Sequence, residues 1–194
     1  MHKIPNRYEA PIDSFLFIFV ERIAPYMSII SPNLITTVGV IFDIIGFYLL
    51  YSTKYYLFGI GCFIIGYFMD CLDGYIARRY NKMTVFGDWY DHITDVMKGI
   101  GILYLLYHFN PKLGFVAIPF ILGFCYITIY HILYQETIYG NNSESPSLNL
   151  IKYITGSPTI KQAEQNIIYT RYFGIGQLQL LMYAFVLYFA YNKA

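Results

Sequence analysis

Clustered aspartates inside long apolar runs constrain this chain more than any other feature of its sequence. About 20 consecutive apolar residues are enough to cross the hydrocarbon core of a bilayer. The stretch 70–95 places four acids between runs of that length, at Asp70, Asp73, Asp91 and Asp95. Because a charged side chain is costly at membrane depth, acids in such a position mark a functional site by default.

The spacing of these acids predicts that they meet. On a helix, Asp70 and Asp73 share a face, and so do Asp91 and Asp95. Two such helices in a hairpin would direct all four carboxylates at one place. Ionised carboxylates cannot share a small pocket without protons or cations. Two divalent cations would balance the four charges, and an all-oxygen site suits Mg²⁺ or Mn²⁺.

The residues that follow the first two acids suit a diphosphate. Gly74 and Ala77 share a helix face and leave room for a ligand or a neighbouring backbone. Arg78 offers a fork of donors that matches phosphate oxygens. Together with the acids they predict a metal–diphosphate site on residues 70–95. The alternative, a polar patch without function in a membrane bundle, is disfavoured because acids are rare at this depth.

The stretch reads Asp-x2-Asp-Gly-x2-Ala-Arg-x8-Gly-x3-Asp-x3-Asp, which resembles the signature of the CDP-alcohol phosphotransferase (CDP-alcohol phosphatidyltransferase) family. Upstream, residues 31–37 are similar to the family's Pro-Asn-x-x-Thr stretch at the start of its first span. The resemblance implies a membrane-embedded enzyme that transfers a substituted phosphoryl group from a CDP-linked donor to an alcohol and releases CMP. All eight fixed positions agree, namely Asp70, Asp73, Gly74, Ala77, Arg78, Gly87, Asp91 and Asp95.

The resemblance also implies a role for each matching residue. The four aspartates would hold two ions, with Asp95 also acting as the base that takes the proton of the acceptor hydroxyl. Asp88 lies on the same helix face, but the family leaves its position open, and a helix first-turn acid is the expected role. The nucleotide pocket would be formed by Asn33, Thr36, Gly74, Ala77, Arg78 and Gly87.

The choice of substrates rests on fewer residues. Asp91-His92 followed by Asp95, together with Ala77-Arg78-Arg79, is similar to the choline and ethanolamine branch. In that branch the donor is CDP-choline or CDP-ethanolamine and the acceptor is diacylglycerol, and His92 would assist proton transfer. The alternative branches use CDP-diacylglycerol with glycerol phosphate, inositol phosphate, serine or inositol. A phosphorylated acceptor would require further cations near the pocket mouth, for which Lys98 and Arg171 are the candidates.

A transporter that carries protons or metal ions on its intramembrane acids is a more distant alternative. Such a protein is expected to show paired repeats or broken helices in two halves, whereas here the acids concentrate in one hairpin. Asp43 is a further acid within an apolar run, and its sequence context leaves a structural and a functional role equally open.

The composition places the whole chain in a membrane. Of its 194 residues, 57% are hydrophobic, 20% aromatic and 13% charged, whereas a soluble domain carries about twice that share of charge. We expect one all-α, polytopic domain over residues 1–194, and the resemblance implies a homodimer. The net charge of +1 gives no reason to expect a nucleic-acid partner.

Five apolar segments predict transmembrane helices. The polar residues 136–165 predict a loop facing water. Residues 12–30 are apolar but interrupted by charges, which predicts an amphipathic helix in the interface within the N-terminal segment 1–32. Since family members usually have six spans, either residues 136–165 conceal one or the last helix is absent. The five segments are residues 33–51, 55–79, 84–108, 113–134 and 167–191.

Basic residues predict the orientation, because cytoplasmic loops carry an excess of lysine and arginine. Only three lie on the side opposite the motif, at Lys54, Lys112 and Lys193. The active site is therefore expected to face the cytoplasm, where nucleotide-activated substrates are made. The basic residues on the motif side are Lys3, Arg7, Arg22, Arg78, Arg79, Lys82, Lys152, Lys161 and Arg171.

Overall fold

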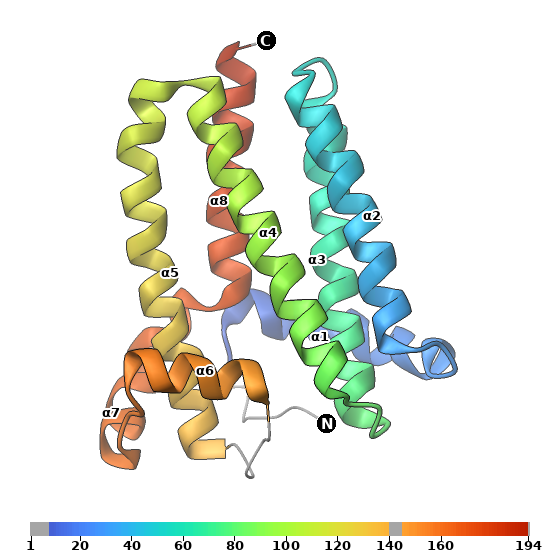
Figure 1. The fold of residues 1–194 in the computed structure, drawn as a ribbon, viewed down its shortest axis with the longest axis vertical. Coiled ribbons are helices and arrows are strands. Elements are labelled where there is room, and N and C mark those ends of the chain that lie inside the picture. The colour runs from blue at the N-terminus through green and yellow to red at the C-terminus, as the bar shows by residue number, and fades with distance from the viewer. Residues whose placement is uncertain (1–7, 140–144, 194) are drawn as a thin grey trace.

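The computed structural model describes residues 8–139 and 145–193, and within these ranges the chain is helical and contains no strand. Long helices run side by side, and shorter ones gather at one end of the bundle (Figure 1). The elements are α1 (Pro11–Met27), α2 (Pro32–Tyr51), α3 (Tyr56–Arg79), α4 (Val85–Phe109), α5 (Pro111–Tyr139), α6 (Pro146–Thr155), α7 (Ile160–Thr170), the 3-10 turn η2 (Arg171–Phe173) and α8 (Ile175–Lys193).

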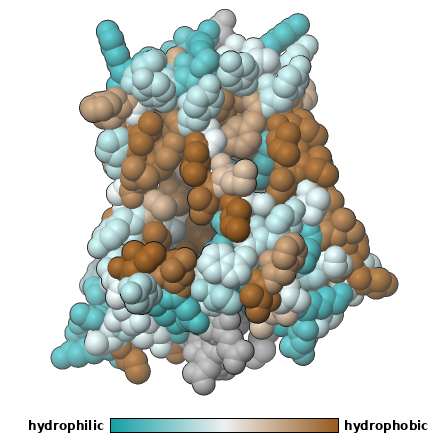
Figure 2. All heavy atoms as spheres, viewed as in Figure 1, coloured by the Kyte–Doolittle hydropathy of each residue, from teal (hydrophilic) through white to brown (hydrophobic). Residues whose placement is uncertain are grey.

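The predicted all-α membrane bundle is confirmed. In the described ranges, four helical segments are long and apolar enough to cross a membrane: α2, α3, α5 and the segment 160–193 that ends in α8. Helix α4 has 25 residues and packs against α2, α5 and α8, so it belongs to the same bundle although its acids make it more polar. Figure 2 shows apolar side chains over the middle of the bundle and polar ones toward both ends.

The helices around the motif begin at polar caps. The Ser31 side chain accepts a hydrogen bond from the Leu34 backbone at the start of α2, and Pro32 follows it. The Thr84 hydroxyl accepts one from the Gly87 backbone at the start of α4. These caps satisfy backbone donors that the first helical turn leaves unpaired. They place the beginnings of α2 and α4 at the end of the bundle where α3 finishes (Figure 1).

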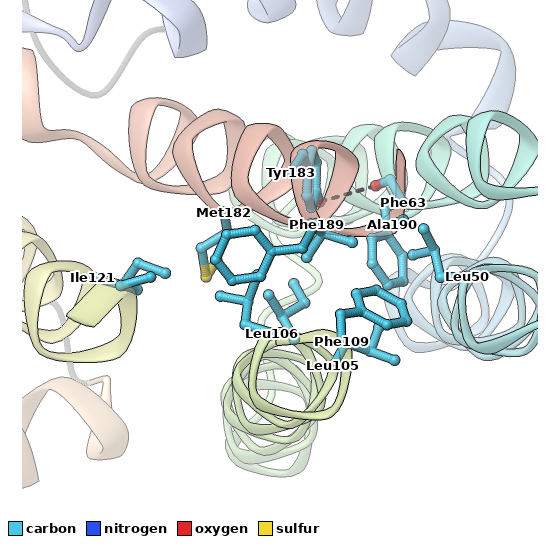
Figure 3. Close-up of a cluster of buried hydrophobic side chains, with 13 residues drawn as sticks. Leu50, Phe63, Leu105, Leu106, Phe109, Ile121, Met182, Tyr183, Phe189 and Ala190 are labelled. Carbon is cyan, nitrogen blue, oxygen red and sulfur yellow. Dashed lines mark hydrogen bonds between the residues drawn. The ribbon is translucent and has the colours of Figure 1, made fainter. Parts of the chain in front are cut away.

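Helices α2 and α3 are in close contact. A Cβ atom at Gly59 would lie 2.7 Å from Leu50 Cγ and 3.0 Å from the Gly46 carbonyl oxygen, so only glycine fits there. Beside this contact, Phe63 and Tyr183 belong to a buried apolar cluster that joins α3 to α4 and α8 (Figure 3). The Tyr183 hydroxyl donates a 3.1 Å hydrogen bond to the Phe63 carbonyl oxygen. The helix that carries Asp70 is therefore held on two sides.

Helix α1 is amphipathic, as predicted, and lies across the end of the bundle (Figure 1). Val20 and Ala24 are buried against a cluster that includes Ile76 of α3, whereas Phe15 and Phe19 are exposed. An apolar face left open on a surface helix is typical of a helix lying in the membrane interface.

Asp13 fixes α1 to the bundle. Its carboxylate accepts a hydrogen bond from the Tyr67 hydroxyl of α3. Burial raises the pKa of Asp13 from its ordinary value of 3.8 to about 6, although the hydrogen bond from Tyr67 acts in the opposite direction. Helix α1 is thus joined to the helix that carries the first two acids of the motif.

The prediction of a loop over residues 136–165 is wrong for most of that range. Helix α5 continues to Tyr139, and α6 and α7 follow; residues 140–144, at the centre of the predicted loop, lie outside the described ranges. Ser145 caps α6, and Thr159 with Gln162 forms a capping box at the start of α7. With 10 and 11 residues, α6 and α7 are too short to cross a membrane. The predicted last helix, residues 167–191, is interrupted: α7 ends at Thr170, η2 follows, and α8 starts at Ile175.

The basic residues of the described ranges lie as the orientation prediction requires. The turns that carry Lys54 and Lys112 lie at one end of the bundle together with Lys193, and the α3–α4 turn, α6 and α7 lie at the other (Figure 1). Lys3 and Arg7 fall outside the described ranges. Which end faces the cytoplasm stays a prediction.

Candidate active site

The α3–α4 hairpin brings three of the four predicted acids together. One carboxylate oxygen from each of Asp70, Asp91 and Asp95 lies within 4.8 Å of the other two. The fourth, Asp73, is buried and accepts a 2.5 Å hydrogen bond from the Thr36 hydroxyl of α2. Asp73 and Asp91 both line the cavity beside this cluster. The acidic site therefore consists of a cluster of three carboxylates with a fourth turned toward α2.

The acids fit a divalent cation. Within the described ranges, Asp91 Oδ1 is buried and has no hydrogen-bond partner. A buried carboxylate oxygen without a donor is strongly unfavourable, whereas a bound cation would satisfy it. All donors in the cluster are carboxylate oxygens, the type that Mg²⁺ and Mn²⁺ prefer. Asp70, Asp91 and Asp95 are thus suited to hold such an ion, with Asp73 beside them.

A cavity of about 370 Å³ opens next to the acids, between the start of α2, the end of α3 and the start of α4. Its volume lies within the range of small-molecule sites. Arg78 brings a guanidinium to its wall, where it can meet phosphate oxygens. All six residues predicted to bind the nucleotide line this cavity: Asn33, Thr36, Gly74, Ala77, Arg78 and Gly87.

The packing around Gly87 explains why a glycine stands there. A Cβ atom at Gly87 would lie 2.7 Å from Asn33 Oδ1 and 3.0 Å from Thr84 Oγ1. Any larger residue would therefore displace the Asn33 side chain or break the cap of α4. The glycine lets the α4 backbone reach the side chain of α2 that is predicted to contact the nucleotide.

The three remaining predicted residues lie in different surroundings. His92 lines the cavity, and its Nδ1 donates a 2.8 Å hydrogen bond to the Asp88 carbonyl oxygen. Lys98 is buried and forms an ion pair with Asp43, so the partner of Asp43 is a residue of another helix. Arg171 belongs to η2 and is not among the residues that line the cavity within the described ranges. The structure does not bring Lys98 or Arg171 to the cavity, and their acceptor-binding role stays a prediction.

Asp88 forms a contact that the sequence did not reveal. It lies in the first turn of α4, as expected, but its carboxylate also accepts hydrogen bonds from the Ser145 hydroxyl at 2.7 Å and the Ser147 backbone at 3.0 Å. Ser145 and Pro146 line the cavity. Asp88 thus fixes the beginning of α6 as a wall of the cavity. Ser145-Pro146 is a recognisable helix-start signal. Its contact with Asp88 joins residues far apart in the sequence, so the sequence alone does not reveal it.

Removing this contact should weaken the nucleotide binding that the motif predicts for this cavity. We expect Asp88→Ala to raise the dissociation constant for CDP by about three- to tenfold, because two hydrogen bonds to a charged carboxylate are lost and α6 is released from the cavity. Ser145→Ala, which removes one of the two bonds, should have a smaller effect in the same direction. Titration of CDP into the purified protein measures both. Unchanged affinity in Asp88→Ala would contradict the role assigned to α6.

Fold and site together define a polytopic membrane protein with a cavity beside a cluster of carboxylates in its helical bundle. A family model described as CDP-alcohol phosphatidyltransferase matches residues 29–191. The chain therefore belongs to the CDP-alcohol phosphatidyltransferase family, whose members are transferases of substituted phosphate groups. The family predicted from the motif is confirmed.

Curated relatives match parts of the chain. A CDP-diacylglycerol–inositol 3-phosphatidyltransferase of Drosophila melanogaster is 31% identical over 125 residues, which are 63% of this chain and 54% of the relative. An Arabidopsis thaliana protein named CDP-diacylglycerol–inositol 3-phosphatidyltransferase 1 is 28% identical over 50% of this chain and 42% of its own length. An archaetidylinositol phosphate synthase of Pyrococcus horikoshii is 33% identical over 39% of each chain.

The matched part of the chain spans about half or less of the length of these relatives. No solved structure gives a significant match to the chain.

Proposed function

We propose that this protein is a metal-dependent phosphatidyltransferase that uses CDP-diacylglycerol as donor and inositol or inositol phosphate as acceptor, and releases CMP. The observation that supports it most is the juxtaposition of three carboxylates within 4.8 Å of one another with a cavity lined by all six residues predicted to bind nucleotide. A diphosphate held by Arg78 in that cavity would lie next to the acids.

The choice of donor follows the relatives rather than the motif. The preference for CDP-choline or CDP-ethanolamine rested on Asp91-His92 with Asp95 and on Ala77-Arg78-Arg79. Two of the relatives, however, carry CDP-diacylglycerol and inositol in their names, and the third is an archaetidylinositol phosphate synthase. These names favour the alternative donor. Membership of a transferase family also removes the reason for considering a transporter.

In the proposed reaction, the acceptor hydroxyl oxygen forms a bond to the phosphorus that carries the diacylglycerol, and the bond from that phosphorus to the CMP oxygen breaks. Asp95 takes the hydroxyl proton, as a positioned carboxylate can. Arg78 holds the phosphate oxygens, and Asn33 and Thr36 hold the cytidine end. Bound Mg²⁺ or Mn²⁺, two ions in our proposal, would supply the charge that stabilises the leaving CMP.

His92 keeps a proposed supporting role in this reaction. Its Nδ1 is engaged with the Asp88 carbonyl oxygen, which leaves Nε2 for proton transfer, and the residue lines the cavity. His92 would therefore assist the passage of the proton away from the acids. We also propose that the cavity faces the cytoplasm, which is supported by the excess of basic residues at its end of the bundle, and that the protein functions as a homodimer.

A substrate panel tests the proposed function. Purified protein in lipid with Mg²⁺ should release CMP from CDP-diacylglycerol when inositol or inositol phosphate is added, and not from CDP-choline or CDP-ethanolamine with diacylglycerol. Glycerol phosphate and serine complete the acceptor panel. CMP release from CDP-choline would instead favour the choline and ethanolamine branch. Failure to release CMP with every pair would overturn the proposal.

A further inference from the structure

A buried ion pair lies one helical turn deeper in the bundle than the acidic cluster. Lys98 follows Asp95 by three residues on α4, and Gly66 precedes Asp70 by four on α3. Lys98, Gly66 and Asp43 line a small cavity of about 20 Å³ together with Asp70 and Asp95. The pair is therefore a neighbour of the acids on the side away from the nucleotide cavity.

The fold surrounds this pair closely. Lys98 Nζ lies 3.0 Å from Asp43 Oδ1, and the two side chains are only 4% and 14% exposed. The ammonium also lies 5.8 Å from the ring centroids of Phe63 and Tyr183, which belong to the central apolar cluster. Breaking such a pair by removing one member leaves an uncompensated buried charge.

Gly66 makes room for the pair. A Cβ atom at this position would overlap the Asp43 carboxylate, so α3 has a glycine where the acid of α2 approaches it. The ion pair thus depends on three helices: α2 supplies the acid, α4 the lysine and α3 the space.

The charges explain what the pair does for the site. When all are ionised to bind metal, the four acids of the motif would carry four negative charges, which two divalent cations would balance. Asp43 would add a fifth if it stood alone, and Lys98 alone would cancel one of the four. We propose that Asp43 and Lys98 are positioning residues of the metal site, whose mutual neutralisation keeps the charge next to Asp70 and Asp95 matched to two divalent cations. This inference rests on the metal dependence proposed above.

The test measures metal binding rather than turnover. Mn²⁺ binding to the full chain, followed by electron paramagnetic resonance, should weaken by about tenfold in Asp43→Asn, where the lysine faces the acids unpaired, and strengthen by about tenfold in Lys98→Met. The double variant restores neutrality and should bind within about threefold of the wild type, as should Lys98→Arg. Glu164→Gln, an exposed acid on α7, is the control for loss of one negative charge.

Opposite shifts in the two single variants support the inference, because a merely structural pair would move both affinities in the same direction or leave both unchanged. Either of those results overturns it. If a single variant folds poorly, the yield of folded protein is compared with and without Mg²⁺. The cation should raise the yield of Lys98→Met and should not raise that of Asp43→Asn. Failure of the wild type to bind Mn²⁺ would instead refute the proposed metal dependence itself.

Discussion

Replacing Asp91 by asparagine is expected to lower CMP release by a hundred- to a thousandfold, on the order of the loss when a metal ligand is removed from a phosphoryl-transfer site. Asparagine has the same shape as aspartate but lacks its charge. Its amide also places hydrogen-bond donors where Asp91 Oδ1 is now buried without a partner among the described residues. The substitution therefore removes the carboxylate oxygen that is best suited to bind a cation, without creating a cavity.

The bundle itself should tolerate this change. Removing one of three carboxylates within 4.8 Å of one another relieves repulsion in the metal-free protein, so thermal unfolding in a chelator should occur at the same or a higher temperature. Glu164→Gln serves as the matched control and should leave CMP release unchanged. A rate in Asp91→Asn close to that of the wild type would refute metal ligation by this residue.

Removal of divalent cations is expected to have the second large effect. Chelation with EDTA should abolish CMP release from CDP-diacylglycerol, and excess Mg²⁺ or Mn²⁺ should restore it, since an all-carboxylate cluster offers oxygen ligands suited to both ions. The cation should also raise the midpoint temperature of unfolding, because a ligand that binds only the folded state stabilises it. Comparing unfolding with and without Mg²⁺ measures this gain.

The same measurement on Asp91→Asn separates specific binding from a general salt effect. The rise in the midpoint temperature of unfolding on adding Mg²⁺ should be much smaller in the variant than in the wild type. An equal rise in both would place the stabilising ion elsewhere. CMP release that continues in EDTA would show that the acids act without a metal.

The convergence of Asp70, Asp91 and Asp95 could be predicted because it depends on local geometry. Spacings of three and four residues fix a helix face, and a short connection at residues 80–84 makes the two helices antiparallel neighbours. Asp73 shares the face of Asp70, yet it is turned to Thr36 of α2. That hydrogen bond joins residues far apart in the sequence, which spacing alone does not reveal.

Features that depend on long-range contacts were missed or left open. The polar composition of residues 136–165 concealed α6 and α7, although Ser145-Pro146 and Thr159 with Gln162 are helix-start signals. The position of α6 at the cavity depends on Asp88, and the partner of Asp43 is a lysine of α4. The acceptor depends on the shape of a cavity formed by several segments, so the motif did not identify it.

The tight packing of α2 on α3 has a mechanical consequence. With the Gly59 and Gly46 backbones in contact, these two helices form a rigid frame that cannot open without losing the contact along its length. The opposite wall of the cavity is held differently, by two hydrogen bonds from the start of α6 to one carboxylate of α4. In the proposed reaction, a nucleotide that enters and leaves in every cycle would therefore displace α6, while the frame keeps the first two acids still.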